Sequence, residues 1–213
     1  MVRRRPWKLA CAAPALLGTV AAAVPQTPPP AATPPGAVSF ANDVVPVLTK
    51  LGCNQGPCHG QQSGKGGFKL SLRGWDPAFD HQQMVREAGG RRADRRDPAR
   101  SLILLKATGR LPHGGGTLLA PYSDAWKILD RWLREGAKGP AEKEPRLVAI
   151  DVAPERIDAD RTGDSRTVRV TARYDDGGRR DVTRWSRFKR QNDAVAGVDD
   201  AGKVSARGPG EAA

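Results

Sequence analysis

Aromatic residues, histidine, methionine and cysteine are all scarce in this chain of 213 residues. Phe, Trp and Tyr together make up 5% of the sequence, which contains three His, two Met and three Cys. Because aromatic side chains are few and no RNA- or DNA-binding motif is present, the net charge of +12 does not indicate nucleic acid, and we expect no such partner. No nucleophile, general base or substrate pocket can be recognised, so the sequence predicts no enzymatic activity.

The N-terminus has the pattern of a secretory signal peptide. Residues 1–8 are basic, and residues 9–24 are apolar and include three consecutive alanines that offer a cleavage site. The apolar run is too short to span a bilayer comfortably, and Pro14 and Gly18 argue against the alternative of a retained membrane anchor. We therefore expect a signal peptide at residues 1–23 and an exported protein, located in the periplasm or at the cell surface.

Residues 24–37 form a Pro/Ala-rich linker, which is expected to be extended. Removal of the signal peptide takes away four basic residues and no acidic one, so the mature chain keeps a net charge of +8. Such a balance suits an acidic partner, an anionic surface or a redox partner steered by charge. Removal of the signal peptide also takes away Cys11, so that Cys53 and Cys58 are the two cysteines of the mature chain.

A histidine directly follows the second of these cysteines, and this adjacency is the most informative feature of the chain. In the pattern Cys-x-x-Cys-His each thiol bonds one vinyl group of a haem, and the adjoining histidine binds the iron. Here four residues separate the cysteines, and two of them, Gly56 and Pro57, are residues that turn the chain tightly. The sequence therefore predicts haem c on Cys53 and Cys58, with His59 as an axial ligand.

Two cysteines in an exported protein are also compatible with a disulfide or a zinc site. A Cys53–Cys58 disulfide would close a very small loop, give little stabilisation and leave His59 without a role. A zinc ion held by these cysteines with His59 and His113 would need Cys58 and His59 together as ligands, an awkward arrangement for tetrahedral coordination.

Residues 38–139 have the pattern of a small all-α domain. Apolar residues recur at helical spacing over 44–51, where Asn42 or Asp43 would cap the helix and Gly52 would end it. Three further helices are expected: over residues 77–88, from the Asp97-Pro98 pair onward, and from Ser123 to Gly136. A domain of this size buries a low fraction of its surface, so a large apolar cofactor at its centre would complete the core.

A charged hinge at residues 140–145 leads to a second segment, 146–213, with the pattern of an all-β sandwich. Val148, Ile150 and Val152 alternate along one predicted strand, and another strand follows at residues 168–174. Turns between strands are expected at 175–178 and 199–202. The segment stops where one more strand would be expected, so this domain is predicted to be incomplete.

Several stretches of the first segment resemble the planctomycete-type cytochrome c domain, namely residues 39–47, 53–60, 66–74, 97–102 and 128–137. The second segment resembles a bacterial Ig-like domain of group 2, in residues 170–177, 181–183 and 202–204. The resemblance implies a mixed fold class, a small all-α cytochrome c-like domain followed by a truncated all-β Ig-like sandwich. The order of the two matches the N-terminal part of large secreted bacterial proteins in which further domains follow.

The family usually places Met-Pro-Pro before the last helix, and the corresponding residues here are Leu111, Pro112 and His113. Leu111 cannot bind iron, whereas His113 would complete a bis-histidine site, whose potential is lower than that of a His/Met site. Met84 and an open sixth position are the alternatives, and a core-filling role explains Met84 better. The expected site is therefore Cys53, Cys58, His59 and His113, with iron held by the two histidines.

The expected function is that of an exported c-type cytochrome module that transfers electrons to an unidentified redox partner. The Ig-like domain would act as a spacer or contact protein or polysaccharide at the cell surface. The alternative is a haem-free structural or adhesion module with a Cys53–Cys58 disulfide or a zinc site. A sensing or catalytic haem domain would instead have an open position, at which carbon monoxide binds the reduced iron without displacing a ligand.

Overall fold

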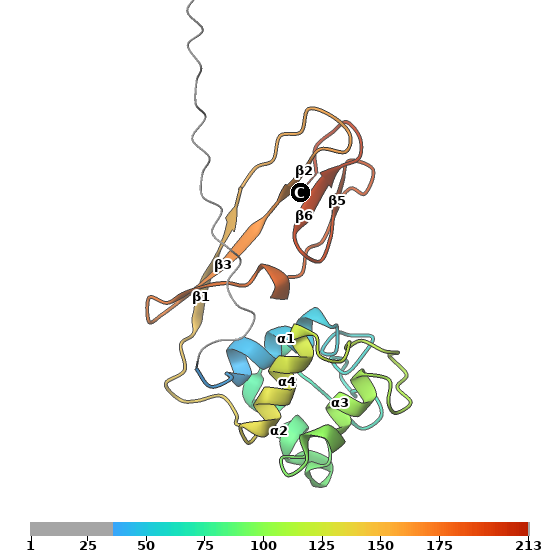
Figure 1. Ribbon diagram of the computed structural model, residues 1–213, viewed down its shortest axis with the longest axis vertical. Helices are drawn as coiled ribbons and strands as arrows, with labels where there is room; N and C mark the ends of the chain where they lie inside the picture. Colours follow the sequence, from blue (N-terminus) through green and yellow to red (C-terminus); the bar gives the residue numbers. More distant parts are fainter. Residues whose placement is uncertain (1–35, 213) are drawn as a thin grey trace, which may run out of the picture. The chain divides into compact units, whose positions relative to one another are not determined.

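The computed structural model describes residues 36–212, which combine short helices with two small antiparallel sheets (Figure 1). The predicted signal peptide and nearly all of the predicted linker lie outside these residues. The helices precede the strands in the sequence, as predicted: the last helix ends at Arg134 and the first strand begins at Leu147. Within residues 36–212 no helix is both long and apolar enough to pass through a bilayer.

The helical part consists of four α-helices joined by loops and short turns. The helices are α1 (Val45–Lys50), α2 (Pro77–Val85), α3 (Leu102–Ala107) and α4 (Asp124–Arg134). A π-helical turn, Phe40–Val44, runs directly into α1, and 3-10 turns lie at Leu72–Gly74, Glu87–Gly90 and Pro98–Arg100. Their apolar faces form one core, whose most deeply buried members include Phe40, Val47, Leu70, Met84, Leu129, Trp132 and Leu133.

The first helical run begins earlier than predicted. Ser39 is its cap, because the Ser39 hydroxyl accepts a hydrogen bond from the Asn42 amide at 2.7 Å, and the Asp43 carboxylate accepts one from the Ser39 amide at 2.8 Å. This reciprocal pair satisfies two amides that the first helical turn leaves free. The prediction of Asn42 or Asp43 as the cap was therefore wrong, although Asp43 takes part in the capping.

The predicted helix after Asp97 is divided in two. Asp97 caps the 3-10 turn Pro98–Arg100, as expected, but Ser101 has an extended backbone and separates this turn from α3. The buried Ser101 hydroxyl accepts a hydrogen bond from the Asp94 amide at 2.8 Å, which fixes this break. The last helix agrees with the prediction: Ser123 caps α4, and Gly136 follows it with a φ of +94° that favours glycine.

The strand part contains two three-stranded antiparallel sheets. One sheet has the order β1 (Leu147–Ala153), β3 (Arg169–Tyr174), β4 (Arg179–Asp181). The other has the order β2 (Ser165–Thr167), β6 (Lys203–Ala206), β5 (Ala196–Val198), and a 3-10 turn lies at Thr183–Trp185. The predicted turns at 175–178 and 199–202 connect β3 to β4 and β5 to β6.

Strand β1 leaves its alternating apolar side chains exposed. Ile150 lies opposite Ala172 and Val152 opposite Val170, so each pair shares one face of the sheet. Ala172 and Val170 are buried, yet Ile150 is 57% exposed and Val152 is 41% exposed. Within the described residues, the side chains that bury this face of β3 therefore do not cover the neighbouring face of β1.

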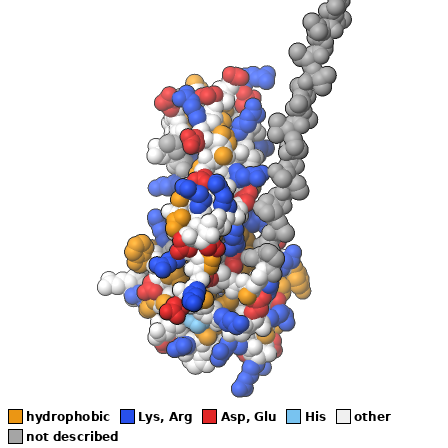
Figure 2. Space-filling model, turned by 90° about the vertical axis from the view of Figure 1, so that its left-hand side faces the viewer, with side chains coloured by type: hydrophobic (Ala, Val, Ile, Leu, Met, Phe, Trp, Pro, Cys, Tyr) orange, Lys and Arg blue, Asp and Glu red, His pale blue; other side chains and the backbone are white. Residues whose placement is uncertain are grey.

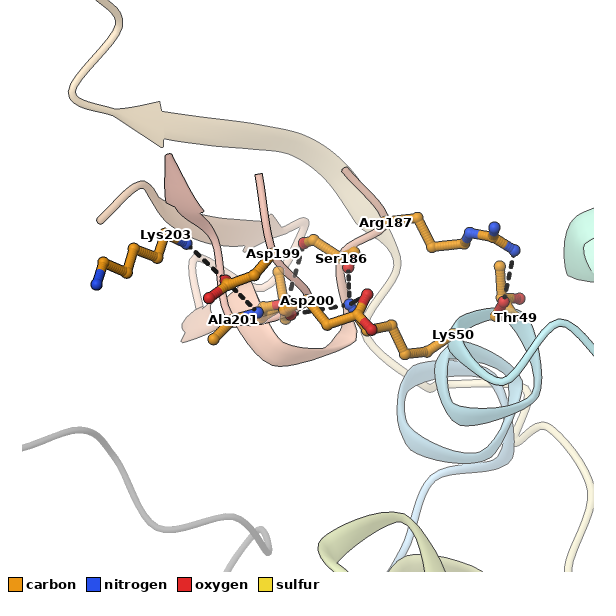
Figure 3. Close-up of polar contacts among 9 residues, drawn as sticks. Thr49, Lys50, Ser186, Arg187, Asp199, Asp200, Ala201 and Lys203 are labelled. Atoms are coloured by element: carbon orange, nitrogen blue, oxygen red, sulfur yellow. Dashed lines mark hydrogen bonds and ion pairs between the residues drawn. The ribbon is translucent and has the colours of Figure 1, made fainter. Parts of the chain in front are cut away.

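Polar contacts join the end of α1 to the strand part (Figure 3). The Lys50 ammonium donates hydrogen bonds to the carbonyls of Ser186 at 2.7 Å and Asp200 at 2.9 Å. The Arg187 guanidinium donates to the Thr49 carbonyl at 3.4 Å. Arg180 forms an ion pair of 2.5 Å with the buried Asp43, whose carboxylate also caps the first helical run. These contacts fix the helix that leads directly into residues 53–60.

Candidate functional site

Residues 53–60 form a compact series of turns that continues from α1. The Cys53 amide donates to the Leu48 carbonyl at 2.9 Å, which ties the loop to the helix. The His59 amide donates to the Cys53 carbonyl at 3.0 Å, and the Gly60 amide donates to the Gln55 carbonyl at 3.0 Å. The chain thus returns on itself between the two cysteines, as the turn residues predicted, and His59 is tied back to Cys53.

Gly60 is the glycine that this loop requires for steric reasons. A Cβ atom at Gly60 would lie 2.2 Å from the Asn54 carbonyl oxygen, which belongs to the backbone and cannot turn away. A Cβ atom at Gly56, the glycine singled out from the sequence, would meet nothing within 4 Å. The close approach of Gly60 to Asn54 therefore permits the tight return of the chain.

Cys53 and Cys58 are free thiols, and both are half-buried. Burial, with a smaller contribution from the nearby Cys58, raises the pKa of the Cys53 thiol to about 11. The two side chains are thus near enough to interact, but the disulfide of the alternative hypothesis is not formed in this structure.

A hydrogen bond to the backbone of Phe68 orients the His59 side chain. Its Nδ1 lies 2.9 Å from the Phe68 carbonyl oxygen, and because a carbonyl only accepts, Nδ1 carries the hydrogen. Burial of the ring lowers the pKa of His59, so the imidazole is neutral at pH 7 and Nε2 has a free lone pair. This is the state in which a histidine binds a metal.

His113 has the same arrangement in a loop before α4. Its Nδ1 donates to the Gly116 carbonyl at 2.9 Å, which again leaves Nε2 free when the ring is neutral. The loop passes close to the imidazole, since a Cβ atom at Gly115 would lie 3.0 Å from Cε1 of His113. Glycine at this position lets the backbone pass the ring.

The fold brings His59 and His113 together from positions 54 residues apart in the sequence. Their ring centroids are 6.4 Å apart and their planes are nearly parallel, at 12°. Met84 is fully buried within the core. His81, the third histidine of the chain, is half-buried, and its Nε2 donates to the Ala137 carbonyl at 2.8 Å.

Arg92 supports the His59 side of the site, a role that the sequence did not reveal. Its guanidinium donates to the carbonyls of Gly67 at 2.5 Å and Gln83 at 2.6 Å, and lies 4.8 Å from the centroid of the Phe68 ring. That ring in turn lies 4.5 Å from the His59 ring. Because Arg92 is 33 residues from His59 and belongs to a run of arginines, no local pattern distinguishes it from its neighbours.

Residues 36–212 contain no group of three or more His, Cys, Asp or Glu side chains placed to hold a metal ion. A tetrahedral zinc site needs at least three protein ligands, so the described residues provide none. A haem needs only one or two ligands from the protein, because the porphyrin supplies the others. The two histidines are thus suited to haem iron and insufficient for zinc.

No protein-family model, curated protein or solved structure matches this chain.

Proposed function

We propose that this protein is a c-type cytochrome module, in which Cys53 and Cys58 would hold a haem covalently and His59 and His113 would bind its iron. The haem would supply reversible one-electron exchange. The residues of the chain would bind the group, fix the direction of both imidazoles and keep the His59 ring neutral.

The observation that carries the proposal is the geometry of the two histidines. Two imidazoles that hold one metal ion through nitrogen, at roughly 2 Å each, would have ring centroids up to about 6 Å apart, since each centroid lies roughly 1 Å beyond its nitrogen. The centroids of His59 and His113 are 6.4 Å apart. Both rings also direct Nδ1 to a backbone carbonyl and leave Nε2 available, as metal-bound histidines do.

The loop of residues 53–60 supports the attachment of the group. It places both thiols on the chain immediately before His59, and the hydrogen bond from His59 to the Cys53 carbonyl keeps these elements together. Both sulfurs are free, as covalent attachment requires. His59 is half-buried, which limits the access of water to this residue.

The proposal also gives each of the two parts of the chain a fold and a role. The helical part would be a cytochrome c-like domain, and the strand part an Ig-like sandwich that acts as a spacer or a contact module. Antiparallel pairing and the presence of two separate sheets support this interpretation of the strand part. Export to the periplasm or cell surface remains an expectation from the N-terminal sequence.

Carbon monoxide binding to the reduced protein tests the proposal. If both histidines bind the iron, the oxidised and reduced proteins should have low-spin haem spectra, and carbon monoxide should bind only slowly. The His113→Ala variant should bind carbon monoxide at once, while the His81→Ala variant should behave like the original protein. A protein without haem absorption after expression with a haem-attachment system would contradict the proposal, and rapid binding to the unaltered protein would contradict the role of His113.

A further inference from the structure

The two edges of the sheet formed by β1, β3 and β4 differ in charge. Strand β4 is one edge, and its residues Arg179, Arg180 and Asp181 are all charged. Strand β1 is the other edge, and Asp151 is the one charged residue among its seven. Charged side chains on an edge strand discourage pairing with another chain. The edge at β4 is therefore protected, and the edge at β1 lacks this protection.

Asp151 does not protect the β1 edge, because its carboxylate is engaged within the sheet. It forms ion pairs with Arg173 at 3.1 Å and with Arg179 at 2.8 Å. Side chains alternate between the faces of a sheet, so Asp151 lies on the face opposite to Ile150 and Val152. The single charge of β1 is thus directed away from its apolar side chains.

The backbone groups of Ile150 and Val152 point to the free edge of the sheet. The Val170 carbonyl accepts a hydrogen bond from the Val182 amide at 2.8 Å, and the Val170 amide donates to the Thr183 hydroxyl at 2.9 Å, so Val170 bonds away from β1. Directly opposite residues of an antiparallel pair exchange both of their backbone bonds or neither. Val152 lies opposite Val170 and therefore forms none with β3, and the same holds for Ile150, two residues before.

Three apolar side chains accompany these free backbone groups. Val148 is 62% exposed, Ile150 57% and Val152 41%, and we call them the apolar stripe. Figure 2 shows one face of the molecule, on which hydrophobic side chains lie among Lys, Arg, Asp and Glu side chains. A partner must therefore match charges as well as apolar groups. Free N–H and C=O groups beside exposed apolar side chains are suited to the addition of a strand.

We infer that β1 pairs antiparallel with β1 of a second copy of this chain, about a two-fold axis at Ile150. Ile150 then lies opposite Ile150 of the second copy, and Val148 lies opposite Val152. Each copy supplies the backbone groups and the apolar side chains that the edge of the other lacks, and a two-fold axis closes the contact on itself. Asp151 lies opposite Ala149 and keeps its arginine partners. The inference concerns the strand part and does not depend on the proposed haem.

Two other positions of the axis conflict with the residues of β1. An axis at Asp151 would place two carboxylates directly opposite each other, which is unfavourable. An axis at Val152 would place Ile150 opposite Pro154 of the second copy, and proline has no N–H to donate to the Ile150 carbonyl. Neither register therefore satisfies the free edge.

An axis at Ala149 conflicts with hydrogen bonds that already exist. It would place Val152 opposite Arg146 of the second copy. The Arg146 amide donates to the Asp175 carboxylate at 2.8 Å, and its carbonyl accepts from the Asp175 amide at 3.0 Å, so its backbone is engaged. In the inferred register Arg146 instead approaches the exposed Glu155 of the second copy, so opposite charges meet at both ends of the apolar stripe.

The test combines sedimentation velocity with amide hydrogen exchange followed by NMR. Two strands of seven residues bury less than the roughly 1,600 Å² of a standard interface, so the dimer should be weak and concentrations should reach about 1 mM. Ile150→Lys places two like charges at the axis. Leu72→Lys is the matched control, because it makes the same change in net charge at a side chain of the helical part that is 54% exposed.

The unaltered protein should approach twice the mass of the monomer as its concentration rises. Ile150→Lys should raise the dissociation constant about tenfold or more, and Leu72→Lys should change it by less than about twofold. The Ile150 and Val152 amides should exchange about tenfold more slowly when nine tenths of the chains are paired. The Asp151 amide bonds to β3, so slow exchange there in Ile150→Lys shows that the sheet is folded.

A mass that stays that of the monomer at every concentration would overturn the inference. So would equal association of Ile150→Lys and the unaltered protein, or growth beyond the dimer, since a two-fold contact closes. If Ile150→Lys does not fold, the exchange of the unaltered protein decides. Concentration-dependent protection that omits the Ile150 and Val152 amides would then contradict the pairing.

Discussion

Arg92 illustrates how one side chain can act on the candidate site without touching its reactive groups. It holds the loop at Gly67 and Phe68 against helix α2, and the Phe68 carbonyl orients His59. Because a nearby cation would stabilise the less positive, reduced iron of the proposed haem, the Arg92→Gln variant should have a lower reduction potential than the unaltered protein. Redox titration measures this directly.

Arg91→Gln is the matched control for this prediction, since Arg91 is the exposed neighbour of Arg92 and its side chain makes no polar contact within residues 36–212. The reduction potential of Arg92→Lys should lie between those of Arg92→Gln and the unaltered protein, because lysine keeps the positive charge. Equal shifts of the reduction potential in Arg91→Gln and Arg92→Gln would show that the position of Arg92 beside Phe68 does not affect the potential.

Cys53 should be an unusually unreactive thiol in the haem-free protein. Its pKa is raised to about 11 from an ordinary value of 9.0, so at pH 9 only about 1% is thiolate, against half of an ordinary thiol. Alkylation of Cys53 by iodoacetamide at pH 9 should therefore be roughly fiftyfold slower than that of a free cysteine. Because ionisation is disfavoured in the folded state, stability should also decrease as the pH rises from 9 to 11.

Peptide mapping after timed alkylation measures the rate at Cys53. The urea-unfolded protein is the reference, in which the same residue should react at the rate of a free thiol. Rapid alkylation of Cys53 in the folded protein would contradict its described burial.

The conformation of the loop of residues 53–60 depends on one of its two glycines. Gly60→Ala places a Cβ atom 2.2 Å from a backbone carbonyl, whereas Gly56→Ala meets nothing within 4 Å. We expect Gly60→Ala to destabilise the protein by at least about 2 kcal/mol, and Gly56→Ala to change stability by less than about 1 kcal/mol. Urea denaturation measures both, and similar effects of the two substitutions would contradict the described loop.

Lys50 connects helix α1 to the strand part mainly through hydrogen bonds to two carbonyl groups. Its ion pair with the Asp200 carboxylate contributes less. The Lys50 side chain is 12% exposed and contacts two carbonyls, while the Asp200 side chain is 98% exposed. Lys50→Met should therefore cost about 1–3 kcal/mol of unfolding free energy, because it removes hydrogen bonds from a charged donor. Asp200→Asn should cost less than about 0.5 kcal/mol, since exposed ion pairs contribute little. The reverse order in urea denaturation would contradict this account.

The whole molecule presents an apolar stripe on strand β1. Val148 is 62% exposed and Ile150 is 57% exposed on an edge strand, an arrangement that favours association between chains. Val148→Thr/Ile150→Thr should reduce concentration-dependent self-association in sedimentation velocity, with less than about 1 kcal/mol lost in stability. Val170→Thr, at a buried position of β3, should cost more, because it buries a hydroxyl. A large loss of unfolding free energy in the Val148→Thr/Ile150→Thr variant would show that these two side chains are buried in the protein.

The sequence allowed prediction of the features that depend on local pattern. The order of helices before strands, the Ser123 cap, the turns at 175–178 and 199–202, and a tight loop around the cysteines all follow from short-range signals. The proximity of His113 to His59 was expected from resemblance to a family, since the spacing alone cannot give it. All of these features depend on residues that are close together in the sequence or that match a recognised pattern.

Other features could not be predicted because they depend on tertiary contacts. Ser39, Asn42 and Asp43 are all good caps, and only the hydrogen bonds identify Ser39. The role of Arg92 depends on Phe68 and helix α2, and the importance of Gly60 on the approach of Asn54. Alternation in β1 predicts that Ile150 and Val152 share a face, but it predicts neither the register shift between Leu147 and Ala149 nor whether the shared face is covered.

The intact mass of the mature protein tests the central proposal most directly. The protein would be produced in a periplasm with a haem-attachment system, beside the Cys53→Ala/Cys58→Ala variant. We predict that the unaltered protein gains the mass of one covalent haem and that the variant gains none. An unaltered protein without this gain, or with only the loss of two hydrogens for a disulfide, would contradict the cytochrome proposal.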